Sequence, residues 1–344
     1  MLRWFSKTWL RCVQLHKRSD VRGQQMTPKI DFDLSGKKIF VCGHKGMVGQ
    51  AVLRRFQQED CEVLTADRNE LDLRDDRAVG EWFEKTRPNA VMLAAAKVGG
   101  ILANDTMPVP FLLDNLRIQN AVINAAYEQG VEKFLFLGSS CIYPVQAALP
   151  MSEDSLLTGL LEPTNQWYAV AKIAGIKLCQ AFRKQHGANF IAAMPTNLYG
   201  PHDNYHPNES HVVAALISRF YAAMRDNHDN LVIWGSGTPL REFLCVDDLA
   251  DGLIYLLKHY NDEAPINIGT GEETSIRELA EILKVISGWK GALKFDTNKP
   301  DGAPRKVMNN CRIHNLGWRH STQLKTGLQQ AYQWFSENQD LVRK

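Results

Sequence analysis

Tyr168 and Lys172 stand four residues apart, so on a helix both side chains project from the same face. A free phenol has a pKa of about 10 and exchanges protons poorly at neutral pH, but a neighbouring cation stabilises the phenolate and lowers that pKa. Ser139 follows an apolar run typical of a strand, and ligands of open α/β sheets bind at the carboxyl ends of strands. Together these residues predict reduction of a carbonyl group, with the phenol as proton donor.

A glycine-rich turn precedes these residues in the chain. It comes directly after an apolar run and opens an amphipathic stretch, which is where a dinucleotide-binding turn belongs. Glycine permits positive φ, lets backbone N–H groups approach a pyrophosphate, and lets the helix pack closely on the strand. We therefore predict a nicotinamide dinucleotide at a turn formed by Gly43, His44, Lys45, Gly46, Met47, Val48 and Gly49.

The end of the second predicted strand carries signals for both nicotinamide cofactors, Asp67 and Arg68. An acidic residue there binds the ribose 2′-hydroxyl of NAD, whereas an Arg accommodates the 2′-phosphate of NADP. Lys45 adds a second cation and favours NADP, although Asp67 would repel a 2′-phosphate if it pointed into the site. We predict NADP on the balance of these charges.

The elements that must position these residues alternate between apolar strands and amphipathic helices. This alternation predicts right-handed crossovers and an α/β fold, a Rossmann-like doubly wound parallel sheet. Past about residue 200 the pattern loosens into loops rich in Pro, Gly and Asn, which predicts a smaller C-terminal α+β substrate domain. We expect a basic extension over 1–35, an NADP-binding domain over 36–200 and a mainly substrate-binding domain over 201–344. The predicted strands are 37–42, 62–66, 90–96 and 133–137, and two of the predicted helices are 79–85 and 110–129.

The formal net charge of +2 comes from 40 basic and 38 acidic residues, with the positive charge concentrated at the N-terminus. Residues 1–29 contain seven basic residues and one acid, so the rest of the chain is mildly acidic and predicts no nucleic-acid partner. The basic stretch has the composition of an organellar presequence. A disordered tail, or sequence upstream of a start at Met26, is the interpretation we prefer.

Seven cysteines are scattered through the chain without a CxxC pair, which argues against a disulfide framework or a zinc site and suits a reducing compartment. His202, His206 and His211 lie in a loop rich in Pro and Asn, without metal-ligand spacing, so we expect no metal. No apolar run approaches the roughly 20 residues of a membrane span. We expect a cytoplasmic protein with no membrane contact.

Seven longer motifs, with the glycine turn, Ser139, Tyr168 and Lys172, carry a resemblance to a known family. They occupy residues 94–101, 138–144, 161–165, 168–175, 194–204, 234–243 and 299–302. The chain from about residue 37 onward resembles the GDP-L-fucose synthases of the extended short-chain dehydrogenase/reductase superfamily. The resemblance implies a homodimer that uses NADPH. It also implies 3,5-epimerisation of GDP-4-keto-6-deoxy-D-mannose followed by reduction at C4.

The resemblance also implies roles for individual residues. Cys141 and His211 would exchange protons on the carbons beside the keto group, while Ser139 would hold the keto oxygen together with Tyr168. Lys172 would bind the nicotinamide ribose and lower the pKa of Tyr168. Further implied cofactor contacts are Arg68, Leu137, Gly138, Ser139, Ser140, Pro195, Thr196, Asn197, Leu198 and His211, and implied substrate contacts are Arg219, Trp234, Arg241 and Asp301.

Two alternatives stay open beside this hypothesis. One is an NAD-retaining sugar-nucleotide 4-epimerase or dehydratase of the same superfamily, which needs no Cys and His pair. The other is a catalytically silent dinucleotide-binding protein, against which the complete Ser, Tyr and Lys set argues. The sequence also departs from the family in the phosphate turn, where the cation is commonly Arg and here is Lys45, a point charge without a bidentate fork.

Overall fold

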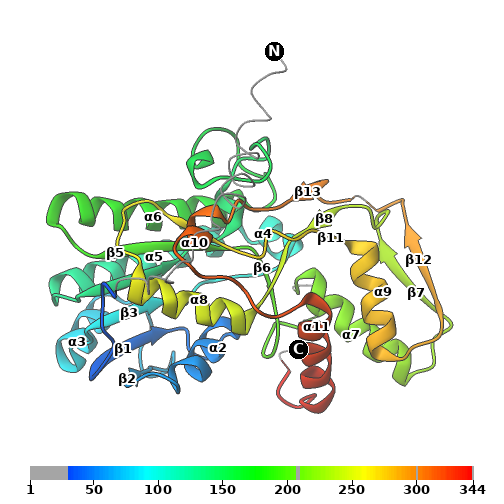
Figure 1. The fold of residues 1–344 in the computed structure, drawn as a ribbon, viewed down its shortest axis with the longest axis horizontal. Helices are drawn as coiled ribbons and strands as arrows, with labels where there is room; N and C mark the ends of the chain where they lie inside the picture. The colour runs from blue at the N-terminus through cyan, green and yellow to red at the C-terminus, as the bar shows by residue number, and fades with distance from the viewer. Residues whose placement is uncertain (1–29, 207–209, 300, 343–344) are drawn as a thin grey trace, which may run out of the picture.

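A six-stranded parallel sheet forms the core of the left-hand half of the molecule as seen in Figure 1. The computed structural model describes residues 30–206, 210–299 and 301–342. The strand order is β10-β5-β4-β3-β1-β2, so β2 and β3 flank β1 on opposite sides, and doubly wound sheets bind ligands at such a switch in strand order. The predicted Rossmann-like α/β fold is confirmed. The strands are β1 (Lys37–Cys42), β2 (Cys61–Leu64), β3 (Ala90–Leu93), β4 (Lys133–Leu137), β5 (Phe190–Pro195) and β10 (Ile266–Ile268).

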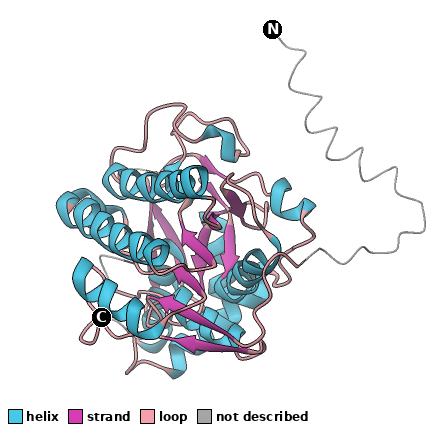
Figure 2. Ribbon diagram, turned by 90° about the vertical axis from the view of Figure 1, so that its left-hand side faces the viewer, coloured by secondary structure: helices cyan, strands magenta, loops and turns pink. Residues whose placement is uncertain are grey.

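Helices cover both faces of this sheet (Figure 2). Side chains of a strand alternate between its two faces, and β1 follows this rule: Ile39 and Val41 pack in the core with α2 and α8. Phe40 and Cys42 pack on the other face with α3, α5 and α6. These helices are α2 (Met47–Phe56), α3 (Asp76–Thr86), α5 (Pro108–Glu128), α6 (Gln166–His186) and α8 (Val246–His259), with the short α4 (Ile101–Thr106) before α5.

The predicted elements of the first half lie where the apolar periodicity placed them. The strands predicted over 37–42 and 133–137 have these bounds in the structure. The helix predicted over 110–129 begins two residues earlier, because Pro108 occupies its first turn, where a missing N–H leaves no hydrogen bond unmade. The strand predicted over 90–96 ends at Leu93, and the backbone beyond it turns away as a loop.

A second apolar core lies beyond the sheet, toward the C-terminus (Figure 1). It buries Phe220, Leu283 and Phe335 between three helices and a two-stranded parallel ribbon. These elements are α7 (Val212–Arg225), β7 (Asn230–Trp234), α9 (Ile276–Ser287), β12 (Ala292–Asp296) and α11 (Leu324–Glu337). The linking elements are η1 (Ser140–Ile142), η2 (Glu153–Ser155), β6 (Asn197–Tyr199), β8 (Leu240–Arg241), β9 (Phe243–Cys245), β11 (Thr274–Ser275), β13 (Arg305–Lys306) and α10 (Cys311–Asn315).

The chain crosses between these two cores more often than a single division at residue 200 allows. After α7 and β7, the chain returns to the sheet through α8, which packs on α2, and through β10, which pairs with β5. Ile266 and Ile268 of β10 are fully buried, and the burial of these apolar side chains stabilises the position of β10 in the sheet. At the other end, Phe32 and Leu34 already pack in the sheet core, while the rest of the predicted extension, residues 1–29, lies outside the described residues.

Three further features of the described residues bear on the expected class of protein. No helix among them is long and apolar enough to cross a bilayer. Five of their cysteines, at positions 42, 61, 141, 179 and 245, are free thiols. Within the same ranges, no three His, Cys, Asp or Glu side chains are grouped so that they could hold a metal ion.

Candidate active site

The glycine turn links β1 to α2 at the carboxyl edge of the sheet. Gly43 has φ +87°, and a Cβ there would lie 2.7 Å from the backbone nitrogen of Ala95, which follows β3. A Cβ on Gly49 would lie 2.2 Å from the carbonyl oxygen of Gly43, so this glycine lets α2 start tight against the turn. Gly46 caps α2, and no side chain occupies the free N–H groups of its first turn. This geometry fits a bound pyrophosphate.

The charged residues beside this turn contact one another. Asp67, just past β2, forms an ion pair with Lys45, and its Oδ1 lies 3.7 Å from His44 Nε2. The hydrogen bond from Lys45 keeps the pKa of Asp67 below its usual value. Arg68 is exposed. Asp67 therefore faces the turn's own cation, and Arg68 is a second exposed positive charge, at the end of β2.

Close packing of α6 on β4 positions the Tyr and Lys. A Cβ on Gly175 would lie 2.4 Å from the ring of Phe136, so only glycine lets the helix approach the strand this closely. Lys172 is buried, and its ammonium donates a 2.7 Å hydrogen bond to the carbonyl oxygen of Leu137 at the end of β4. Burial lowers the pKa of Lys172 to about 8. The Lys172 ammonium is therefore held at the end of β4 by this hydrogen bond.

Tyr168, Ser139 and Cys141 form a contiguous group. The Ser139 hydroxyl lies beside the Tyr168 phenol, and the backbone N–H of Cys141 donates to Ser139 Oγ at 3.4 Å. Phe111 packs edge-on against the ring of Tyr168, with their centroids 6.5 Å apart. Burial raises the pKa of Tyr168, and the Cys141 thiol adds to this effect. Lys172 is not among the groups that shift the pKa of Tyr168, and with burial as the largest influence the phenol is protonated at neutral pH.

His211 comes from a distant part of the chain, at the N-cap of α7. Its side chain reaches solvent, yet the surrounding protein crowds it, and burial followed by the charge of Lys306 lowers the pKa of its imidazole. The same Lys306 acts on Cys141: burial raises the pKa of that thiol, and Lys306 is the strongest opposing influence. The fold thus brings Cys141 and His211, far apart in sequence, to one shared cation.

The four predicted substrate residues differ in their exposure and in the bonds they already make within the protein. Trp234, at the end of β7, is 69% exposed, and Lys299 Nζ lies 5.3 Å from its ring centroid. Arg219 donates to the carbonyl oxygen of Val232 and is exposed. Arg241 is half-buried on β8 and donates a 2.6 Å hydrogen bond to the carbonyl oxygen of Ala303.

Asp301, the fourth predicted substrate residue, is engaged within the protein. Its two carboxylate oxygens accept hydrogen bonds from the backbone N–H and hydroxyl of Ser236, at 2.9 and 2.7 Å. Gly235 next to Ser236 has φ +80°, and a Cβ there would lie 2.2 Å from Asp301 Oδ1. Asp301 therefore shapes the turn that follows Trp234.

A buried carboxylate missed in the sequence supports the residues after β5. Glu242 is fully buried; its backbone oxygen accepts hydrogen bonds from Thr196 Oγ1 at 3.3 Å and Asn197 Nδ2 at 2.8 Å. Its carboxylate accepts three more, from the N–H groups of Gly271 and Met308 and from the amide of Asn310. A Glu inside a substrate motif gave no sign of such burial. Pro195 and Leu198 flank Thr196 and Asn197 on β5 and β6.

Lys306 is the second functional candidate that sequence reasoning missed. It lies on β13, in register with Arg241 of β8. Two adjacent basic residues at 305 and 306 are typical of solvated surface charges. Only the strand pairing seen in the structure distinguishes Lys306 from Arg305.

Comparison with known proteins agrees with this geometry. Residues 39–269 match the model of the NAD dependent epimerase/dehydratase family. The chain belongs to this family. Two relatives of this family member are the GDP-L-fucose synthases of Sinorhizobium fredii (strain NBRC 101917 / NGR234), 57% identical over 89% of this chain and 97% of theirs, and of Escherichia coli (strain K12), 49% identical over 90% and 100%. The described fold is also similar to a GDP-L-fucose synthetase from Naegleria fowleri bound to NADP, with TM-score 0.84, 31% identity, and coverage of 91% of this chain and 98% of that one.

Proposed function

We propose that this family member is a GDP-L-fucose synthase, which epimerises GDP-4-keto-6-deoxy-D-mannose at C3 and C5 and then reduces C4 with NADPH. One observation carries the proposal. Tyr168 lies beside Ser139 and Cys141 at the carboxyl end of β4, in a chain 57% identical to a GDP-L-fucose synthase. This grouping puts a hydroxyl, a phenol and a thiol within reach of one sugar ring.

NADP fits the described residues. The unobstructed first turn of α2 would take the pyrophosphate, Arg68 the 2′-phosphate, and Lys172 the nicotinamide ribose after leaving the carbonyl oxygen of Leu137. NADPH supplies the hydride that reduces C4. Since Asp67 already pairs with Lys45, its negative charge is compensated before a 2′-phosphate arrives.

Cys141 and His211 are proposed to carry out the epimerisations. A carbon next to the 4-keto group loses its proton to one of the two side chains, and the carbonyl becomes an enolate. The other side chain then returns a proton to the opposite face of that carbon. The hydroxyls of Ser139 and Tyr168, which lie side by side, would donate to the enolate oxygen.

Reduction requires a proton for the oxygen at C4. Tyr168 suits this step because burial keeps its phenol protonated at neutral pH. After donation the phenolate must be stabilised, and Lys172, with Nζ 5.7 Å from the centre of the Tyr168 ring, is the nearby cation that can do so. Ser139 keeps the oxygen in place during both steps.

The GDP part of the substrate would lie toward the C-terminal core. The exposed indole of Trp234 offers a flat apolar surface for a base or sugar ring. Arg219 and Arg241 offer guanidinium groups for the phosphates, and burial lowers the pKa of both, as expected for cations partly withdrawn from water. Asp301 would contribute by holding the turn beside Trp234.

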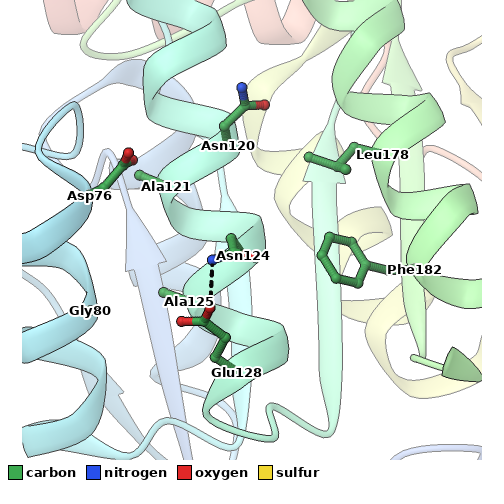
Figure 3. A pocket seen from close by; sticks show the side chains of 9 residues that line it. All are labelled: Asp76, Gly80, Asn120, Ala121, Asn124, Ala125, Glu128, Leu178 and Phe182. Atoms are coloured by element: carbon green, nitrogen blue, oxygen red, sulfur yellow. Dashed lines mark hydrogen bonds between the residues drawn. The ribbon is translucent and has the colours of Figure 1, made fainter.

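We propose a homodimer formed through α5 and α6. These helices pack against each other, and both present apolar side chains to solvent: Val109 and Leu113 on α5, Trp167 and Val170 on α6. A groove between α3, α5 and α6 opens on the same helices (Figure 3). Its residue Leu178 lies about 15 Å along α6 from Tyr168, so the groove is separate from the active site.

The cytoplasm is the compartment we propose, because Cys42, Cys61, Cys141, Cys179 and Cys245 are free thiols and suit reducing conditions.

The deciding assay incubates the full chain with GDP-4-keto-6-deoxy-D-mannose and NADPH. We expect oxidation of one NADPH per sugar and a product that co-elutes with GDP-L-fucose. A protein that purifies with tightly bound NAD and consumes no NADPH would instead support the NAD-retaining epimerase or dehydratase. A protein that binds NADPH without turnover would support the silent alternative.

A further inference from the structure

Lys306 is a cation in the active site that the mechanism above does not use. Strand β13 pairs in parallel with β8, which sets Lys306 beside Arg241. Its neighbour Arg305 is exposed and forms an ion pair with Glu273. Side chains of successive strand residues point to opposite sides, so Lys306 points away from Arg305 and into the site.

The strand is held firmly on both sides of this residue. The N–H of Leu240 donates to the carbonyl oxygen of Pro304 at 2.9 Å, and the N–H of Met151 donates to that of Val307 at 2.9 Å. One residue further, the N–H of Met308 donates to the buried carboxylate of Glu242 at 2.8 Å. A backbone fixed at 304, 307 and 308 leaves Lys306 little freedom of position.

Several charged and titratable groups surround the Lys306 ammonium. Burial lowers the pKa of Lys306, and among the surrounding groups Cys141 on η1 opposes this most strongly. Arg241 on β8, Glu162 and Glu242 follow. The charge of Lys306 also adds to the effect of burial in lowering the pKa of His211, which lies at the N-cap of α7. The Glu242 carboxylate already accepts three hydrogen bonds, so much of its charge is satisfied without Lys306. Among the described residues, none forms a hydrogen bond with Lys306 Nζ.

Lys172, the other cation near Cys141, is engaged elsewhere. Its ammonium donates to the carbonyl oxygen of Leu137, and the proposed function gives it the nicotinamide ribose. Lys306 also has the larger effect of the two on the thiol. A buried thiolate needs a compensating positive charge, and Lys306 is the cation placed to supply it.

We propose that Lys306 is a positioning residue for epimerisation, whose ammonium stabilises the negative charge on the Cys141 sulfur whenever that thiol gives up its proton. The proton itself passes between Cys141 and the sugar carbon, and Lys306 neither gains nor loses one. This role rests on the proposed function, which requires Cys141 to exchange protons beside a keto group. The electrostatic part can be measured without any substrate.

The test measures alkylation of Cys141 by iodoacetamide across pH in the full chain, read peptide by peptide by mass spectrometry. Replacement Lys306→Met keeps an unbranched side chain and removes the charge. We expect it to move the alkylation profile of Cys141 upward by about one pH unit, a roughly tenfold slower reaction at neutral pH. Lys306→Arg keeps the charge and should stay within about twofold of the parent. Cys61, which lies on β2, serves as an internal reference and should not change.

Arg305→Met is the matched control, since it removes the neighbouring charge on the opposite side of β13. An unchanged Cys141 profile in Lys306→Met, or an equal shift in Arg305→Met, would overturn the proposal. If Lys306→Met loses its cooperative thermal transition, Lys306→Gln takes its place. Loss of folding in both would also count against the proposal, because an electrostatic role does not require Lys306 for the fold.

A second measurement links the charge to catalysis. With GDP-4-keto-6-deoxy-D-mannose in D2O, Lys306→Met should incorporate deuterium about tenfold more slowly than the parent, while a sugar already epimerised should be reduced at the parental rate. Equal slowing of both steps would contradict a role confined to Cys141. If the parent itself shows no turnover, the proposed function fails, and the alkylation profiles still decide the role of Lys306.

Discussion

At the scale of the residue, burial decides the proton states in this site. Burial raises the pKa of Tyr168 and of Cys141 and lowers the pKa of Lys172 and of His211, so each group is shifted toward its neutral form. A site with neutral donors suits an uncharged keto sugar. Burial also lowers the pKa of Lys306 and of Arg241, and the charge that either side chain carries acts with little screening by water.

Replacement of Tyr168 by Phe tests the proton donor. The ring and its contact with Phe111 remain, but the hydroxyl is lost, so we expect NADPH oxidation to fall by about 10²- to 10⁴-fold. Binding of NADPH, followed by its fluorescence, should stay near the parental value. Near-normal turnover in this variant would reject Tyr168 as the donor.

At the scale of the element, a few close contacts place the helices that carry the site. Gly49 lets α2 approach the phosphate turn, and Gly175 lets α6 approach β4, at distances where a Cβ would overlap the neighbouring atoms. The buried Glu242 ties β8 to the loops after β10 and β13. The site therefore depends on residues that do not touch the reacting atoms.

A pair of glycine replacements tests this dependence. Gly49→Ala places a Cβ 2.2 Å from the Gly43 carbonyl oxygen, so we expect a loss of about 1–3 kcal/mol in stability and weaker NADPH binding. A Cβ at Gly80, within α3, would enter open space with no neighbouring atom within 4 Å, so Gly80→Ala should stabilise by about 0.5–1 kcal/mol. Thermal melts and NADPH titrations compare the two variants. A similar change in both would show that close approach is unimportant.

Lys133 at the start of β4 makes stability depend on pH. It is fully buried, donates to Asn189 Oδ1 at 3.0 Å and to the carbonyl oxygen of Tyr260, and burial lowers its pKa to about 7. An unfolded Lys has a pKa of about 10.4, so between these values the unfolded chain binds a proton that the folded chain lacks. This residue's contribution to stability therefore rises as pH increases from about 7 to about 10.

Replacement Lys133→Met isolates that contribution. The variant loses the hydrogen bonds of Lys133 at every pH. The free-energy cost of burying the Lys133 charge depends on pH and is present only in the parent. We therefore expect the melting temperature of Lys133→Met, relative to the parent, to fall between pH 7 and pH 9.5. A difference in melting temperature that stays constant over this interval would show that Lys133 is not desolvated as the fold implies.

At the scale of the whole molecule, the proposed active site lies where the sheet meets the C-terminal core. Ser139, Tyr168 and Lys172 come from the sheet and its helix, while His211, Arg241 and Lys306 come from segments that link to the second core. The return of α8 and β10 to the sheet, between these segments, joins the two parts. Epimerisation and reduction can then share one position of the sugar.

The proposed dimer is also a property of the whole molecule. The double replacement Leu113→Lys and Val170→Lys should convert a dimer into a monomer, because both positions are exposed and apolar on the paired helices. Leu160→Lys is the control, since Leu160 is 88% exposed on a loop before α6. Sedimentation velocity gives the masses. A parent that sediments as a monomer, or a dimer that survives the double replacement, would contradict this interface.

The order of apolar strands and amphipathic helices up to residue 137 predicted the Rossmann-like sheet, because burial on both faces produces local patterns that can be read along the chain. The glycine turn and the spacing of Tyr168 and Lys172 could also be read from neighbouring residues in the sequence. The rise in the pKa of Tyr168 by burial, the pairing of Asp67 with Lys45, and the return of β10 to the sheet could not be read in this way. Only the tertiary structure brings Lys306 to Cys141 and His211, because their proximity arises from strand pairing between distant segments.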